Sequence, residues 1–182
     1  MEHARSLVRQ RHRLMQDQTR CKNRIKHLLM FSGLRVESVQ ERWSQKYLKQ
    51  LRELNCGTEV LRSALDLAVE QYQQIRKLLK EATLLIRKLS KQEPFTTVQK
   101  YLQSIDGIGI INGMAIQTEL QDICRFKTLD SLCAYCGFVP DISSSNDTIV
   151  IKGVTHRCNE FLREAIVESS WMLIRKDPAM LM

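Results

Sequence analysis

A run of three serines, Ser143–Ser145, is the place in this 182-residue chain where a nucleophile stands out. A serine hydroxyl is a weak nucleophile until a base or a cation assists it. By composition alone, serines followed by Asn and Asp are more typical of a solvated turn. Groups able to stabilise a phosphoryl transition state follow closely in the sequence, at Lys152, His156, Arg157 and Arg163.

A second candidate is the sequence Asp106-Gly107-Ile108-Gly109, which separates two apolar helical segments. Two glycines around one aliphatic residue predict a tight hairpin that lets a ligand approach the backbone. Free amides at the start of the second helix suit a phosphate. Gly107, Ile108 and Gly109 are therefore candidate contacts to a nucleic-acid backbone, in a helix-hairpin-helix element. The alternative is an ordinary turn between two helices.

The other chemical signals are weak. The chain has no P-loop, HExxH or GxSxG sequence. Cys133 and Cys136 match a CxxC pattern, and with His156 and Cys158 they could form a zinc site. No second ligand pair with zinc spacing exists, so cysteines packed in a core explain the pattern better, and we expect no metal site. The chain begins without a signal peptide, so its six cysteines indicate reduced thiols in a cytoplasm.

Positive charge is concentrated near the N-terminus. Residues 1–35 contain nine Lys or Arg and two acids, which gives +7 of the formal net charge of +8. This asymmetry indicates a polyanionic partner, nucleic acid before membrane, while a solubilising helix face remains the alternative. The candidate RNA contacts are Arg9, Arg13, Arg20, Lys22, Arg24 and Lys26.

Three helices are expected before Pro94. The first spans residues 2–32 and ends at Gly33; a shorter one runs from a Ser38 cap to about 54; the third runs from a Thr58 cap to about 91. The third has an unbroken alternation of four- and three-residue steps typical of a coiled coil, at Leu61, Leu65, Ala68, Tyr72, Ile75, Leu79, Ala82, Ile86 and Leu89. A compact domain of about 80 residues could not bury this seam alone, so the helix must pack on the first helix, on a partner chain, or on both. We expect a homodimer or higher homo-oligomer.

Glu93-Pro94 marks the expected boundary between a basic helical arm, 1–92, and a second domain, 95–182. In the second domain a helix starts at Thr96-Thr97, Thr128 caps a helix that ends near 137, and Thr155 caps a last helix that ends at Asp177. Residues 141–154 predict a polar loop or short β insertion. The predicted fold class is mainly α.

Five motifs in order along residues 98–178 resemble the C-terminal domain of the insertion-sequence one-ten family of transposases, relatives of the Piv-type DNA invertases. The family shows a "PGIG" hairpin, an "RF" pair, a "GLVP" turn, an "SSG" motif and "ITKRGNxxLR". The corresponding residues here are 106–109, Arg125-Phe126, 137–140, 144–146 and 153–163. The chain departs from the family pattern at Asp106, Asn146, His156 and Cys158.

The resemblance implies a role for these residues. In the family a serine of the "SSG" motif attacks DNA, which maps to Ser145, with Ser144 as the alternative. The hairpin glycines, Lys152, His156, Arg157, Asn159 and Arg163 are then expected to contact DNA. Family members also carry a RuvC-like domain with metal-binding acids and use a structured bridge RNA. That domain is not in this chain, so we expect Mg²⁺ only together with it and no activity from this chain alone.

We therefore expect the C-terminal fragment of a DNA transposase or recombinase that binds DNA and guide RNA in a bacterial cytoplasm, at the nucleoid. Two alternatives stay open. One is a non-catalytic nucleic-acid-binding module, and the other is a coiled-coil assembly protein with no nucleic-acid partner.

Overall fold

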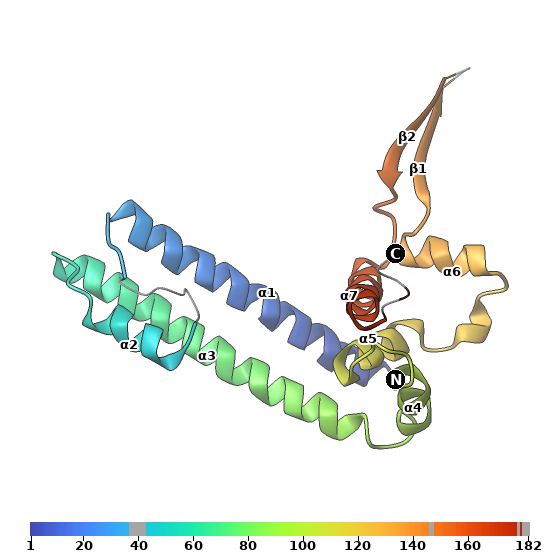
Figure 1. The fold of residues 1–182 in the computed structure, drawn as a ribbon, viewed down its shortest axis with the longest axis horizontal. Coiled ribbons are helices and arrows are strands. Elements are labelled where there is room, and N and C mark those ends of the chain that lie inside the picture. Colours follow the sequence, from blue (N-terminus) through green and yellow to red (C-terminus); the bar gives the residue numbers. More distant parts are fainter. Residues whose placement is uncertain (37–42, 146–147, 178, 180–182) are drawn as a thin grey trace. The chain divides into compact units, whose positions relative to one another are not determined.

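The computed structural model describes residues 1–36, 43–145, 148–177 and 179 (Figure 1). Within these residues seven α-helices and one two-stranded antiparallel sheet make the chain mainly α, as predicted. Two compact units are present: unit 1 combines Met1–Arg9 with Leu84–Met182, and unit 2 is Gln10–Thr83. The functions assigned to 1–92 and 95–182 stay predictions.

Unit 2 is built from parts of α1 (Glu2–Phe31) and α3 (Glu59–Leu89), with α2 (Gln45–Glu53) between them in the sequence. Two predicted helix signals are confirmed: Gly33 has a left-handed φ of 65° after α1, and the Thr58 hydroxyl accepts a hydrogen bond from the Leu61 amide at 3.3 Å. The predicted start of the short helix was wrong, because Ser44 provides its N-cap. Ser38 lies outside the described residues.

The predicted seam of α3 is covered within unit 2. Figure 1 shows the two long helices running antiparallel, with α2 alongside them. Leu65, Val69 and Tyr72 of α3 pack in one buried cluster with residues of both other helices, among them Ile25 and Leu48. The seam in this unit therefore has its partner inside the chain and does not by itself require a second copy.

The C-terminal end of α2 is closed by one arginine from α3. The Arg62 guanidinium donates to the carbonyl oxygens of Leu51, Arg52 and Leu54 at 2.9 to 3.0 Å. It also pairs with Asp66, at 2.7 Å. The last carbonyl groups of a helix have no intrahelical donor, so this side chain fixes where α2 stops.

Unit 1 surrounds α5 (Ile110–Leu120), of which every residue from Gly113 to Glu119 is buried. It packs against α4 (Thr96–Gln103) and α7 (Glu160–Lys176). A hydrogen bond of 2.9 Å between two buried side chains, Gln99 and Gln117, joins α4 to α5. The core cluster includes Met114, Leu162, Ile86 and, from the first turns of α1, Val8.

A short 3-10 helix (Ile123–Arg125) and α6 (Leu129–Cys136) lead to the sheet. Thr128 caps α6 with a capping box, as predicted. The short strand pair expected within residues 141–154 is present: β1 (Pro140–Ser145) pairs with β2 (Thr148–Val154). Figure 1 shows this ribbon extending away from the helices of unit 1.

The predicted cap of the last helix was wrong. The Thr155 amide instead donates to the Val139 carbonyl oxygen at 3.0 Å, which continues the pairing at the base of the ribbon. The N-cap of α7 is Asn159, whose Oδ1 accepts from the Leu162 amide at 3.1 Å. None of the helices in the described residues is both long and apolar enough to cross a membrane.

The two glycines of the α4–α5 turn differ in whether a side chain would fit at their positions. Gly107 has φ of 92°, and a Cβ there would lie 2.3 Å from the Ser169 carbonyl oxygen and 2.7 Å from the Leu173 amide nitrogen. Gly107 thus allows the turn to rest on the backbone of α7. Gly109 is the N-cap of α5 with φ of −85°, and a Cβ there would meet nothing within 4 Å. Only Gly107 is required by packing.

We predict that Gly107→Ala destabilises the chain by about 3 kcal/mol or more, because the added methyl overlaps backbone atoms and the left-handed φ is strained. Gly109→Ala is the matched control and should change the free energy of unfolding by about 1 kcal/mol at most. Denaturant unfolding followed by circular dichroism measures both. Equal stability of the two variants would contradict this packing.

Candidate functional site

The candidate serines lie at the far end of the β-ribbon. Ser144 is paired with Ile149 and Ser145 with Thr148, the last pair before the connection between the strands. Asn146 lies outside the described residues, and for Ser144, Ser145 and Lys152 the structure describes the backbone alone. Their assigned roles stay predictions.

The segment after β2 contains four of the predicted DNA contacts. His156 and Arg157 are exposed. Arg163 is directed to its own chain, since Nη1 donates to the Thr155 carbonyl oxygen at 3.1 Å. Asn159 likewise is held by the fold, as its cap role shows. The structure therefore leaves His156 and Arg157 available to a partner and uses the other two to fix the turn that presents them.

A buried carboxylate holds this turn in place. The side chain of Glu119, at the end of α5, has no exposed surface. Arg9 donates to its two oxygens from Nε at 2.6 Å and Nη2 at 2.8 Å, and Arg5 lies 2.9 Å away. Asn159 Nδ2 donates to the same carboxylate at 2.6 Å and to the Tyr135 hydroxyl at 3.1 Å. We call these five residues the Glu119 cluster.

The cluster keeps Glu119 ionised. Burial raises the pKa of the carboxyl, but hydrogen bonds from Arg9, Arg5 and Asn159 outweigh burial and lower the pKa from 4.5 to about 2. The same hydrogen bonds raise the pKa of both arginines. Charge-assisted and bidentate pairs are the strong class of hydrogen bond, so the cluster joins the start of α1, the end of α5 and the start of α7.

Sequence reasoning missed this cluster. Arg9 was predicted as an RNA contact, and in the structure its guanidinium pairs with Glu119. A signal was present, because Glu119 is the only charged residue between Asp106 and Asp122. An acid in so apolar a helix needs partners. The arginine partners of Glu119 lie 110 or more residues away in the sequence, so local sequence does not identify them.

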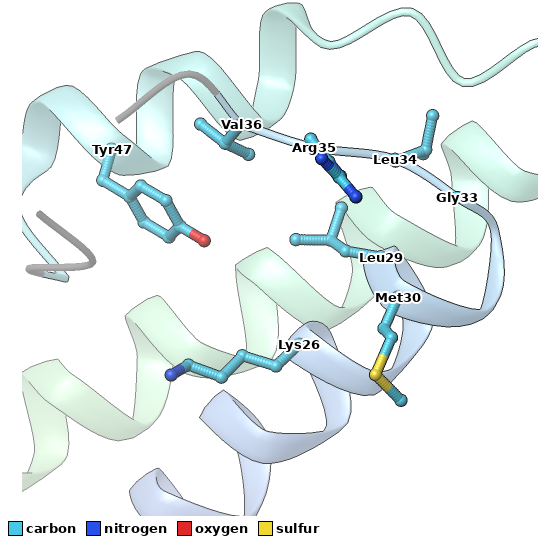
Figure 2. A pocket seen from close by; sticks show the side chains of 8 residues that line it. All are labelled: Lys26, Leu29, Met30, Gly33, Leu34, Arg35, Val36 and Tyr47. Carbon is cyan, nitrogen blue, oxygen red and sulfur yellow. The ribbon is translucent and has the colours of Figure 1, made fainter. Parts of the chain in front are cut away.

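The remaining candidate RNA contacts lie on α1 within unit 2, in varied surroundings. Arg13 is exposed, Arg20 pairs with Asp17 at 3.0 Å, and Arg24 donates to Gln71 at 2.8 Å. Lys22 lies 6.0 Å from the ring centroids of two aromatic residues. Lys26 lines a hollow of about 610 Å³ (Figure 2) together with Leu29, Met30, Gly33, Leu34, Arg35, Val36 and Tyr47.

The Arg125-Phe126 pair has a structural explanation. The guanidinium carbon of Arg125 lies 4.6 Å from the ring centroids of both Phe126 and Tyr135, and the two rings are 5.3 Å apart. A cation over aromatic faces is stabilising. Since Tyr135 also touches Asn159, this stack supports the Glu119 cluster from the side of α6.

In the part of the chain that is described, no three His, Cys, Asp or Glu side chains gather to hold a metal ion. Cys136 is buried in the core. A Cβ on Gly137 would lie 2.4 Å from the sulfur of Cys158, so Gly137 leaves the space that this cysteine fills. Cys158 needs no left-handed backbone, because Gln121 is the only described non-glycine residue with positive φ.

We predict that Glu119 makes stability depend on pH. Its folded pKa lies below its ordinary value, so its stabilisation is complete above about pH 4.5 and is lost as the pH falls toward 2. The loss should be on the order of 2 to 3 kcal/mol, because the arginines stay partly exposed. Denaturant unfolding between pH 2 and 7 measures it.

Glu119→Gln should be destabilised at neutral pH and show a flatter profile in this acid range, because it has no proton to bind. Exposed Glu168 on α7 is the control, and Glu168→Gln should keep the wild-type profile. An unchanged acid profile in Glu119→Gln would show that the cluster does not carry the effect.

Two comparisons with known proteins bear on this unit. Residues 99–181 match the model of a family described as the Transposase IS116/IS110/IS902 family. The transposase for insertion sequence element IS1111A of Coxiella burnetii (strain RSA 493 / Nine Mile phase I) is 26% identical to this chain, over 93% of the chain and 46% of that protein. The chain thus spans about half the length of this curated relative. Residues 99–181 are therefore a transposase IS116/IS110/IS902 domain, and the chain is a distant relative of the IS1111A transposase.

Proposed function

We propose that this chain acts in DNA transposition, binds DNA through unit 1, and supplies the serine that attacks the DNA. The observation that carries the proposal is the family match over 99–181, which includes the serine ribbon and the turn with exposed His156 and Arg157 at its base. Cations next to a backbone phosphate neutralise its charge and position it without reading sequence.

In the proposed step the Ser145 hydroxyl oxygen bonds to the phosphorus of one DNA phosphodiester. The bond from phosphorus to one deoxyribose oxygen breaks, and the serine proton ends on that departing oxygen. The product is a phosphoserine ester to one DNA end and a free hydroxyl on the other. Reversal of the same step with a different DNA hydroxyl exchanges strands and leaves the serine unchanged.

The described acids do not fit a Mg²⁺ site. No group of three potential ligands is present among them, and Glu119 is committed to Arg5 and Arg9. We assign activation of the serine to a RuvC-like acidic domain that acts together with unit 1. Mg²⁺ would bind in that acidic domain.

For the arm we propose contact with structured RNA through the basic residues of α1. Residues 18–36 contain five Lys or Arg and no acid, and such a segment attracts phosphates of any sequence. Pairing into a homodimer through the outer surface of the arm is part of the proposal. Because α1 and α2 cover the seam in unit 2, the assembly-protein alternative has lost its main support.

A non-catalytic nucleic-acid-binding module is the second candidate. The lack of a metal-ligand cluster in the described residues favours it over a self-sufficient enzyme. The two candidates predict the same binding and differ in whether a covalent product forms.

We predict no protein–DNA adduct from this chain alone, and an adduct when a RuvC-like acidic domain is joined ahead of Met1 and guide RNA is supplied. In that protein Ser145→Ala should abolish the adduct, because the attacking oxygen is gone, and Ser144→Ala should reduce it less. Ser143→Ala is the matched control. Denaturing gels of labelled DNA measure the covalent product.

Three results would correct this assignment. Adduct in Ser145→Ala but none in Ser144→Ala moves the nucleophile by one residue. Adduct in the double variant removes the serine proposal. No adduct in the parent protein, with DNA binding retained, favours the non-catalytic module.

We predict that Arg20, Arg24 and Lys26 changed together to Glu weaken RNA binding at least tenfold and flatten its salt dependence, since fewer counterions are released. The control changes exposed Lys46, Lys77 and Lys80 to Glu, with the same change in net charge. Fluorescence anisotropy at several salt concentrations measures both. Equal losses in the two variants would mean that net charge alone matters.

A further inference from the structure

The last residue of α1 has an aromatic ring that is exposed to solvent. Phe31 is 86% exposed, although large apolar side chains are usually covered. It borders a shallow hollow of about 480 Å³ on one stripe of the helix, lined also by Asn23, Arg24, His27 and Leu28. The hollow thus combines an apolar floor and an open ring with side chains that can donate hydrogen bonds.

The ring is carried by a rigid helix end. The Leu34 amide donates to the Leu29 carbonyl oxygen at 2.9 Å, and the Gly33 amide donates to that of Met30 at 3.2 Å. With Gly33 at φ of 65° this is a Schellman motif. Figure 2 shows the turn, with Leu29 and Leu34 beside it. The backbone of the last turn is therefore fixed, and little order is lost when a ligand stacks on it.

The charge around the ring selects the kind of partner. Residues 18–36 carry five Lys or Arg and no acid, so a second copy placed on the same surface would meet like charge. A polyanion is attracted instead. At the end of the helix itself the macrodipole is negative. A phosphate is therefore disfavoured beside Phe31, whereas an uncharged base attached to a nearby phosphate backbone is not.

We propose that Phe31 is a stacking platform for an unpaired base of a structured RNA, with Asn23, Arg24 and His27 placed to contact the edge of that base. Unpaired bases in bulges and loops are what aromatic side chains of proteins take from folded RNA. The inference rests on the proposed RNA contact of α1 and adds to it a preference for RNA with an unpaired nucleotide.

The test uses the full chain and two RNA hairpins that differ by one bulged 2-aminopurine. Stacking is worth about 1 to 3 kcal/mol per base, or roughly 5- to 150-fold in affinity, so the wild-type chain should prefer the bulged hairpin by that order. Fluorescence of the 2-aminopurine should fall on binding. Phe31→Ala should lose both effects and keep the affinity for the paired hairpin, while Phe31→Trp should keep both.

Met30→Ala is the matched control, since Met30 is the neighbouring residue and is 72% exposed. It should keep the preference for the bulge. Thermal unfolding by circular dichroism should be unchanged in each variant, because an exposed side chain packs against little. The same bulge in a DNA hairpin should be bound more weakly.

The outcomes separate this inference from the proposed function. A wild-type chain that binds both RNA hairpins equally, or a Phe31→Ala chain that keeps the preference, overturns the platform and leaves RNA binding intact. Equal preference for the DNA bulge overturns the assignment to RNA. A change in oligomeric state in Phe31→Ala without loss of the preference assigns the surface to a protein partner. Failure of the wild-type chain to bind either RNA removes the proposed RNA contact together with the platform.

Discussion

The carboxylate of Glu119 is the constraint on which unit 1 depends. Its side chain is fully buried, and an ionised carboxylate without partners in such a place is strongly unfavourable. Its described partners include Arg5 and Arg9 of α1 and Asn159, the cap of α7. The start of the chain is thereby bound into a unit whose other residues begin at Leu84.

This constraint separates the folding unit from the part that the family comparison matches. The match covers 99–181, while the compact unit also needs residues 84–98 and 1–9. Ala4 and Val8, buried in the same core as Met114 and Leu162, add an apolar reason for this. A shortened chain that starts at residue 99 would leave Glu119 without its two arginines. Its behaviour would then report on a damaged fold rather than on the site.

Structural features that depend on residues close together in the sequence could be predicted. Gly33, Thr58 and Thr128 act through groups within a few residues of themselves, and the periodicity of α3 identified its buried face. Where several capping residues compete, local reasoning chose wrongly, as at Thr155, because the Thr155 amide is taken by Val139 across the ribbon. The isolated position of Glu119 in an apolar helix indicated that it needs partners, but its pairing with Arg9 depends on the tertiary fold. The approach of Gly107 to the backbone of α7 depends on the tertiary fold in the same way.

The five short motifs, by contrast, identified the family, because their order along the chain is specific. They say less about which surface meets a partner. Of the described residues in the last motif, Asn159 and Arg163 hold the turn and His156 and Arg157 are exposed, a division that residue type alone does not reveal.

The proposed function requires that a serine at the end of the β-ribbon become covalently bound to DNA. Tandem mass spectrometry of a nuclease-treated adduct, from this chain joined to an acidic RuvC-like domain and supplied with guide RNA, tests it most directly. We expect a nucleotide attached through phosphate to Ser145. A modified residue other than Ser144 or Ser145 would contradict it.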